Sequence, residues 1–213
     1  RIEVARLEAT VVGCEAPRLL LDRIRLSDPL FVLDEANAGV VSGICRRLEG
    51  MPLGLELAAS QARALSVHEI GAHLDALPPA PAGHVEHARH KTLQASIAWS
   101  YAIASPPERA LFRRLAVFRG GCSSEAARAV GSGEDVGAEY VPVLLESLVA
   151  KSLLSVVHRE DIARYRCLVP IRRFGESMLN ECGDAEDTRA RHLAWFHALA
   201  AQVQRVELQV VPG

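Results

Sequence analysis

The first activity to consider from the residues of this chain is the binding and hydrolysis of nucleoside phosphates. A phosphate-binding loop needs Gly-Lys followed by Ser or Thr after a glycine-containing turn, because backbone N–H groups must close around the phosphate oxygens. The sole Lys-Thr pair is Lys91-Thr92, and His90 stands where the glycine is required. We therefore expect no catalytic residues and no ATPase activity in this chain alone.

A second candidate is the apolar run at 31–33, which ends in Asp34 and Glu35. In phosphate-transfer enzymes such an acidic residue at a strand end holds Mg²⁺. The alternative is that Asp34 caps a helix that begins at Glu35, its carboxylate accepting free N–H groups. Because the run is short for a central strand, we favour the cap.

Three histidines, His84, His87 and His90, recur at a spacing that allows zinc binding on one helical face. Pro81 and Gly83 precede them, however, and no cysteine is near. A solvated polar linker is the favoured interpretation, and we predict no metal site. No local nucleophile motif accompanies the scattered Ser, His and acidic residues.

The composition describes a folded chain with no strong charge. Its 213 residues are 49% hydrophobic and carry a formal charge of −2, which argues against a chain built to coat nucleic acid. The cysteines are odd in number and widely spaced, so a reducing, cytoplasmic setting is expected. They are Cys14, Cys45, Cys122, Cys167 and Cys182. No apolar run is long enough to cross a membrane.

The first half of the chain reads as one strand followed by helices. Residues 2–7 alternate like a half-buried strand, and helical spacing follows through Leu20 to Ile24 and again over 34–48. Residues 53–65 are apolar on every side, which predicts a helix buried all round. Ser66 and Glu69 form a capping box that starts a third helix in this bundle.

The second half has the order of a winged helix. After the proline-rich stretch 78–83, Ser105 and Glu108 form another capping box, and helices are expected near 125–130 and at 141–150. Residues 152–157 and 162–167 flank a polar tetrad, which predicts a β-hairpin. Pro170 suits the first turn of the next helix. A last helix from Asp184 is expected to turn four residues inward: Leu193, Phe196, Leu199 and Val203.

DNA reading by this winged helix is not favoured by its residues. The helix at 141–150, which precedes the hairpin, has almost no side-chain donors for base edges. Four arginines are candidates for phosphate contacts, but alternating strand arginines more often form a solvated face: Arg164, Arg166, Arg172 and Arg173.

Five segments of the chain carry a resemblance to a known family, in this order: 44–59, 90–101, 105–121, 149–153 and 165–168. They resemble bacterial signal-transduction ATPases of the NB-ARC/STAND type, which include AfsR-like and LuxR-associated transcriptional regulators. The resemblance implies that a longer parent protein is a slow ATPase. It implies a mainly α fold: a helical lid bundle, then a winged-helix domain with one β-hairpin, then a C-terminal helix that starts a helical region.

The resemblance also implies a nucleotide site. In that family the Gly-x-Pro turn lies near the adenine of ADP or ATP, and here the turn falls on Gly50, Met51, Pro52 and Leu53. A plain helix-to-helix turn is the alternative. Mg²⁺ and the phosphates are expected to be held upstream of Arg1. The family's Glu-Thr pair is replaced by Val169-Pro170, which weakens phosphate sensing by the winged helix.

The expected domains are a terminal strand of a truncated P-loop domain (1–14), the lid (15–80), a linker (81–89), the winged helix (90–182) and the start of a helical sensor region (183–213). The expected partners are the P-loop domain and helical repeats in cis, and further copies on activation. DNA is reached only through other domains, and no membrane is involved. Two alternatives stay open: a self-sufficient winged-helix DNA-binding protein, or a catalytically inactive helical scaffold.

Overall fold

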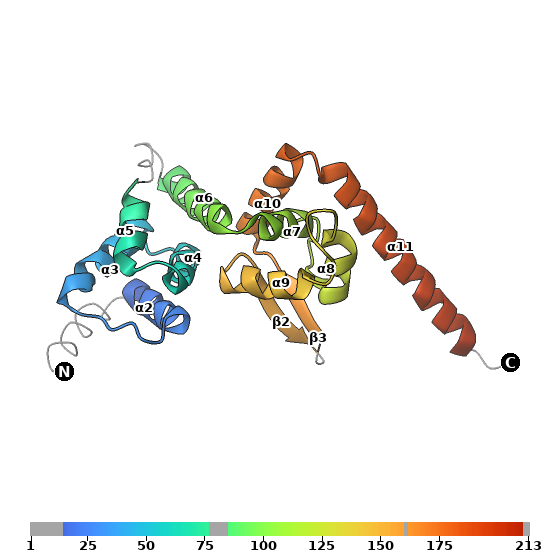
Figure 1. Cartoon of the computed structure of the whole chain (residues 1–213), viewed down its shortest axis with the longest axis horizontal. Coiled ribbons are helices and arrows are strands. Elements are labelled where there is room, and N and C mark those ends of the chain that lie inside the picture. The colour runs from blue at the N-terminus through green and yellow to red at the C-terminus, as the bar shows by residue number, and fades with distance from the viewer. Residues whose placement is uncertain (1–14, 77–84, 160–161, 211–213) are drawn as a thin grey trace. The chain divides into compact units, whose positions relative to one another are not determined.

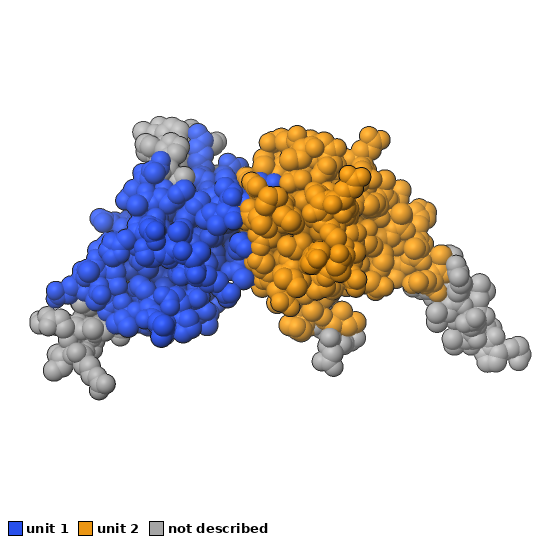
Figure 2. Space-filling model, viewed as in Figure 1, with its two compact units in different colours: residues 1–103, 150–152 blue, residues 104–149, 153–213 orange. Residues whose placement is uncertain are grey.

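A computed structural model describes residues 15–76, 85–159 and 162–210 of the chain. The strand expected at 1–14 lies outside these residues. The chain divides into two compact units, drawn in different colours in Figure 2. The first unit comprises residues 1–103 with 150–152, and the second comprises residues 104–149 with 153–213. Within the described ranges, no helix combines the length and the apolar character needed to cross a membrane.

The first unit is a bundle of helices (Figure 1). Its elements are α2 (Glu15–Ser27), α3 (Glu35–Arg47), α4 (Pro52–Ser60), the 3₁₀ helix η1 (Gln61–Arg63), α5 (Val67–Ala76) and α6 (Val85–Ile103). α2 packs on α3 and α4, α5 packs on α3, and α6 packs on α4. The buried helix predicted over 53–65 is confirmed in its first part as α4, and its last residues form η1 instead.

Local polar contacts set the helix starts of this bundle. The Asp34 carboxylate accepts the Asn37 N–H at 2.9 Å, and the Asn37 side-chain oxygen accepts the Asp34 N–H at 3.0 Å. Ser66 and Glu69 form the predicted capping box before α5. The Ser66 backbone N–H, and next its hydroxyl, lower the pKa of Glu69. Each cap satisfies N–H groups that have no partner inside the helix.

The core of the first unit is apolar. Leucine, isoleucine and valine side chains from α2, α3, α4 and α5 fill it, and Trp99 of α6 closes one side. The Trp99 indole stacks on the His73 imidazole with ring centroids 4.3 Å apart. A few buried polar groups are paired with one another, such as the Gln61 amide, which donates to the Ser100 hydroxyl at 3.3 Å. Burial of apolar surface therefore supplies most of the stability here.

The second unit combines helices with a small sheet (Figure 1). In chain order it contains α7 (Pro106–Leu115), β1 (Cys122–Ser123), α8 (Ser124–Gly131), α9 (Val141–Ala150), β2 (Ser155–Arg159), β3 (Ile162–Arg166), α10 (Val169–Glu181) and α11 (Ala185–Val210). The strands are antiparallel in the order β1-β3-β2. The hairpin, the α9 helix and the Ser105–Glu108 capping box were predicted and are confirmed. The short strand β1 was not predicted.

Glycines allow the helices of this unit to approach closely. A Cβ at Gly131 of α8 would overlap Leu111 Cδ1 of α7. A Cβ at Gly175 of α10 would lie 3.0 Å from the Ala116 Cβ, directly after α7. The lack of a side chain at these two positions therefore sets the distance from α7 to α8 and to α10.

Two expectations differ from the structure. Residues 85–89 of the expected linker belong to α6, and the compact units divide after Ile103 rather than near residue 89. The prediction that Leu193, Phe196 and Leu199 face inward is wrong, because these side chains are 60%, 46% and 41% exposed. α11 packs on α8, and the Phe196 ring lies near Phe118 with centroids 6.5 Å apart, which leaves the side chain only partly covered. The side chain of Val203 lies outside the described residues.

Candidate functional site

The turn between α3 and α4 contains the four predicted site residues. α3 ends at Arg47, and Glu49 and Gly50 then adopt positive φ values of 51° and 65°. The Gly50 N–H donates to the Cys45 carbonyl at 2.9 Å, and the Met51 N–H donates to the Leu48 carbonyl at 2.9 Å. Two successive left-handed residues reverse the chain within one turn, which favours glycine at the second.

Pro52 is the first residue of α4, where a missing N–H costs nothing. The Met51 carbonyl accepts the Leu55 N–H at 3.0 Å, so the turn continues directly into the helix. Pro52 is exposed, whereas Gly50, Met51 and Leu53 are half-buried. The four predicted residues thus form one rigid turn that presents a flat apolar proline ring at the surface.

A pocket of about 800 Å³ lies between α3 and α5 in the same unit. Gly39 and Gly43 of α3 leave open space where a Cβ would stand. The charged residues at the pocket are of both signs: Arg46, Arg47, Glu49 and Asp75. The Arg47 Nε donates to the Leu74 carbonyl at 3.0 Å, which ties α3 to α5. Glu49 belongs both to this pocket and to the turn, so the two features are neighbours.

The structure decides between the two interpretations of Asp34, a Mg²⁺ ligand or a helix cap, but not between those of the three histidines. Asp34 is the N-cap of α3, and the residues before it form no strand, so the cap interpretation is confirmed. The side chains of His84, His87 and His90 lie outside the described residues. Elsewhere in the described ranges, no group of His, Cys, Asp and Glu side chains is placed to hold a metal ion.

The helix that would read DNA in the winged helix is α9. Val141, Leu145 and Leu148 are buried, while Val143 and Glu146 are exposed. Between residues 132 and 150 the sequence holds four acidic residues and no basic one. The exposed side of α9 therefore offers neither base-reading donors nor cations for phosphate.

The arginines that the sequence indicated lie on two elements: Arg164 and Arg166 on β3 of the hairpin, and Arg172 and Arg173 on α10. Arg164 donates to the Gly121 carbonyl at 3.1 Å, and Arg172 pairs with Glu176. Arg166 and Arg173 are exposed. Two of the four arginines thus form contacts within the unit, and the other two are exposed on its surface.

Val169 and Pro170 form the first turn of α10 and are exposed. Burial, and secondarily the neighbouring Cys122, raises the pKa of the Cys167 thiol to about 12. Burial raises the pKa of Cys122 to about 12 as well. Neither thiol forms the reactive thiolate near neutral pH.

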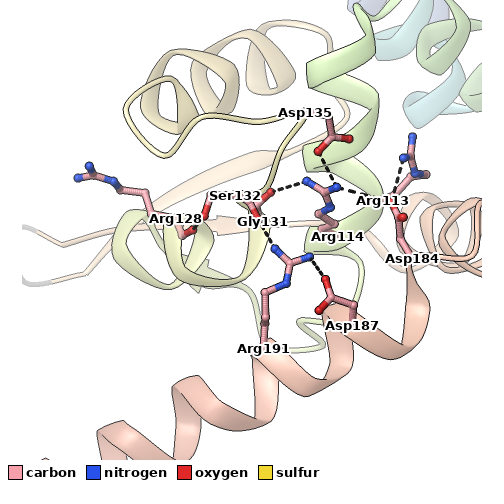
Figure 3. A network of polar contacts seen from close by, with 9 residues as sticks. All are labelled: Arg113, Arg114, Arg128, Gly131, Ser132, Asp135, Asp184, Asp187 and Arg191. Carbon is pink, nitrogen blue, oxygen red and sulfur yellow. Dashed lines mark hydrogen bonds and ion pairs between the residues drawn. The ribbon is translucent and has the colours of Figure 1, made fainter.

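A polar network that the sequence did not predict connects α7, α8 and α11 (Figure 3). Arg114, whose side chain is 8% exposed, pairs with Asp135 at 2.6 Å and with Asp184 at 3.7 Å, and donates to the Gly131 carbonyl at 3.0 Å. Arg113 pairs with Asp184 at 3.1 Å. Asp184 thereby receives two guanidinium groups directly before α11 begins.

The same network continues along α11. Arg191 donates to the Ser132 carbonyl at the end of α8 and pairs with Asp187 at 2.9 Å. The His192 ring packs edge-on against Phe118 with centroids 4.7 Å apart, and burial lowers the pKa of His192. The only sequence signal for this network is the Arg113-Arg114 pair on a helix that is otherwise apolar on one side.

Comparison with known protein families identifies the type of domain in the second unit. Residues 105–180 match the family model described as a winged helix-turn-helix domain. The fold class predicted from the sequence is therefore confirmed: a mainly α chain with a helical region followed by a winged-helix domain.

Similar whole proteins come from mycobacteria. The chain is 40% identical over 200 residues to proteins of Mycobacterium tuberculosis and Mycobacterium bovis that are named "Putative HTH-type transcriptional regulator". It is 38% identical over 181 residues to an uncharacterised protein of Mycobacterium tuberculosis. These alignments include 93% and 84% of the chain. They cover 23% of the regulators and 46% of the uncharacterised protein, so the chain spans about a quarter of the regulators' length.

Proposed function

We propose that the chain is the coupling part of a nucleotide-dependent, STAND-type transcriptional regulator. In this proposal the first unit contacts the adenine of ADP or ATP through Gly50, Met51, Pro52 and Leu53. The phosphates and Mg²⁺ are held by other residues of a longer, cytoplasmic protein. The winged helix then transmits the nucleotide state to the rest of that protein.

The observation that carries the proposal is the rigid turn that presents Pro52. Adenine is flat and largely apolar, and a proline ring packs against such a group without a competing backbone donor. The fixed hydrogen bonds of Gly50 and Met51 keep the ring in place before a ligand arrives, which lowers the entropic cost of binding. The names of the regulators that the chain resembles agree with a role in transcription.

Coupling requires that the nucleotide bind one arrangement of the protein better than the other, since a ligand shifts an equilibrium only through its differential affinity. The residues around the turn suit the base rather than the phosphates, because the one Lys-Thr pair of the sequence, Lys91-Thr92, lacks the glycine of a phosphate-binding loop. The chain alone is therefore expected to bind ADP weakly.

The test measures ADP binding by calorimetry in the longer protein that contains this chain, and in the chain alone. We expect Pro52→Arg to weaken ADP binding by about tenfold, equivalent to 1.4 kcal/mol. Leu30→Arg is the matched control, because Leu30 is 88% exposed in the same unit and lies outside the turn. Equal affinity of Pro52→Arg and the unsubstituted protein would remove the turn from the nucleotide site.

DNA binding by the winged helix is the second candidate function, favoured by the match of residues 105–180 and by the exposed Arg166. Such binding would use phosphate contacts from the hairpin rather than α9. Fluorescence anisotropy of a labelled duplex at several salt concentrations tests it. A steep loss of affinity with salt that becomes shallower in Arg166→Gln would support this function.

A further inference from the structure

The surface beside α9 holds an apolar groove. The groove has a volume of about 440 Å³ and is lined by Pro107, Val136, Tyr140, Val143 and Leu144, together with Glu134 and Asp135. Tyr140 is 62% exposed and Val143 is 65% exposed. Large apolar side chains so exposed next to a concave surface are typical of a protein contact.

Glu134 and Asp135 line this groove, and the stretch of chain around them is acidic. Glu134, Glu139 and Glu146 are exposed and belong to the stretch 132–150, which has no basic residue. Asp135 is the one acidic residue of the stretch that pairs with an arginine in the described structure, through Arg114. The groove therefore favours an occupant that brings apolar side chains together with positive charge.

The hairpin of the same unit has a surface of this complementary kind, which we call the wing face. The strand register pairs Val157 with Arg164, Ser155 with Arg166, and Arg159 with Ile162. Directly paired residues of antiparallel strands point to the same side of the sheet, so Val157, Ile162, Arg164 and Arg166 share one face. Ile162 is 58% exposed and Val157 is 40% exposed, and Arg166 lies exposed on the same strand as Ile162.

We propose that the groove beside α9 binds the wing face of a second copy of this chain. Tyr140 and Val143 would cover Ile162 and Val157, and the Glu134 and Glu139 carboxylates would meet the Arg166 guanidinium. Both surfaces are exposed in the single chain, so neither is already covered by the other. The proposal concerns the winged helix alone and requires no nucleotide, so it stands apart from the function proposed above.

The contact would join two different surfaces, and each copy would keep one groove and one wing face free. Such a head-to-tail contact builds chains or rings rather than a closed symmetric dimer. DNA is the less favoured occupant of the wing face, because phosphate contacts leave the apolar Val157 and Ile162 uncovered.

The test is sedimentation velocity of the 213-residue chain without nucleotide, over a concentration series that reaches several hundred micromolar. We expect the weight-average sedimentation coefficient to rise with concentration, with species larger than a dimer at the top of the series. Val143→Glu in the groove and Ile162→Glu on the wing face are each expected to abolish the rise. Arg166→Glu is a second wing-face variant, and circular dichroism establishes that each variant is folded.

Mixing the two variants gives the decisive result. Val143→Glu retains an intact wing face and Ile162→Glu retains an intact groove, so an equimolar mixture is expected to form a dimer and nothing larger. Leu193→Asp is the matched control, because Leu193 is an equally exposed apolar residue of α11 outside both surfaces. It is expected to associate like the unsubstituted chain.

Several results would overturn the proposal. The unsubstituted chain could be a monomer at every concentration, or Val143→Glu and Ile162→Glu could associate like it. Leu193→Asp could lose association, or the mixture of the two variants could form no dimer. Loss of duplex binding in Ile162→Glu and Arg166→Glu, together with unchanged sedimentation of the unsubstituted chain as a monomer, would assign the wing face to DNA instead.

Discussion

Different kinds of contact stabilise the inside of each of the two units. In the first unit, leucine and isoleucine side chains fill the core, and the polar contacts at the starts of α3 and α5 join residues three apart in sequence. In the second unit, buried arginines join α7 to residues far along the chain, as Arg113 does with Asp184. The difference teaches that α11 is attached to the winged helix by charge as well as by apolar packing.

Replacing Arg114 gives the largest expected effect and tests whether buried charge stabilises the second unit. Arg114→Met keeps the length of the side chain but leaves the Gly131 carbonyl and the Asp135 and Asp184 carboxylates with fewer partners. We expect the second unit to lose about 2 kcal/mol, less than for a fully buried pair because both carboxylates are partly exposed. Urea unfolding of a Trp99→Phe background, in which Trp195 of α11 reports on the second unit alone, measures the loss.

A double-variant cycle with Asp184→Asn provides the control for this prediction. If Arg114 and Asp184 interact as described, the two losses are less than additive by about 1 kcal/mol. Additive losses would mean that the buried arginine stabilises the unit by packing alone, and the contrast between the units would disappear.

Removing a local helix cap of the first unit is expected to lower the free energy of unfolding by less than Arg114→Met does. Asp34→Ala removes the acceptor of the Asn37 N–H and is expected to cost about 1 kcal/mol. Trp99 fluorescence in a Trp195→Phe background reads out the first unit. Glu35→Gln, which changes only a first-turn charge, is the matched control, with an expected loss of a few tenths of a kcal/mol. A larger loss for Asp34→Ala than for Arg114→Met would reverse the comparison.

The smallest expected effect concerns His192, whose pKa is lowered from its ordinary value of 6.5 because burial disfavours the charged ring. The unfolded chain binds this proton more readily, so stability decreases as the pH falls below 6.5. His192→Phe retains the ring contact with Phe118 and removes this contribution. Urea unfolding at pH 7.5 and pH 5.5 should show a smaller decrease in the variant; equal decreases would contradict the assignment.

The contrast between local and long-range contacts also explains which features the sequence could predict. The capping boxes at Ser66 and Ser105, the cap at Asp34 and the hairpin after α9 each follow from residues within a few positions of one another. They were predicted and are confirmed. The strand β1 has two residues and pairs with β3, about 40 positions later, so no local pattern indicates it.

The site predictions divide in the same way. The turn at Gly50 and Pro52 was predicted from a short motif, and the structure shows a hydrogen-bonded turn with an exposed proline. Its contact with a nucleotide stays a prediction. The Arg113 and Arg114 network was missed, because Asp184 lies about 70 positions away and its approach depends on how α11 returns to α7. The inward face assigned to Leu193 and Phe196 failed because periodicity identifies an apolar side but not whether a neighbour covers it.

The glycines that bring α7 close to α8 and α10 have a mechanical consequence. Gly131 and Gly175 let the Leu111 and Ala116 side chains lie directly against the backbone of α8 and α10. An alanine at Gly131 would place its Cβ 2.3 Å from the Leu111 Cδ1, so either α8 or the Leu111 side chain would have to move. In a close-packed interior such a shift passes on to the neighbouring helices.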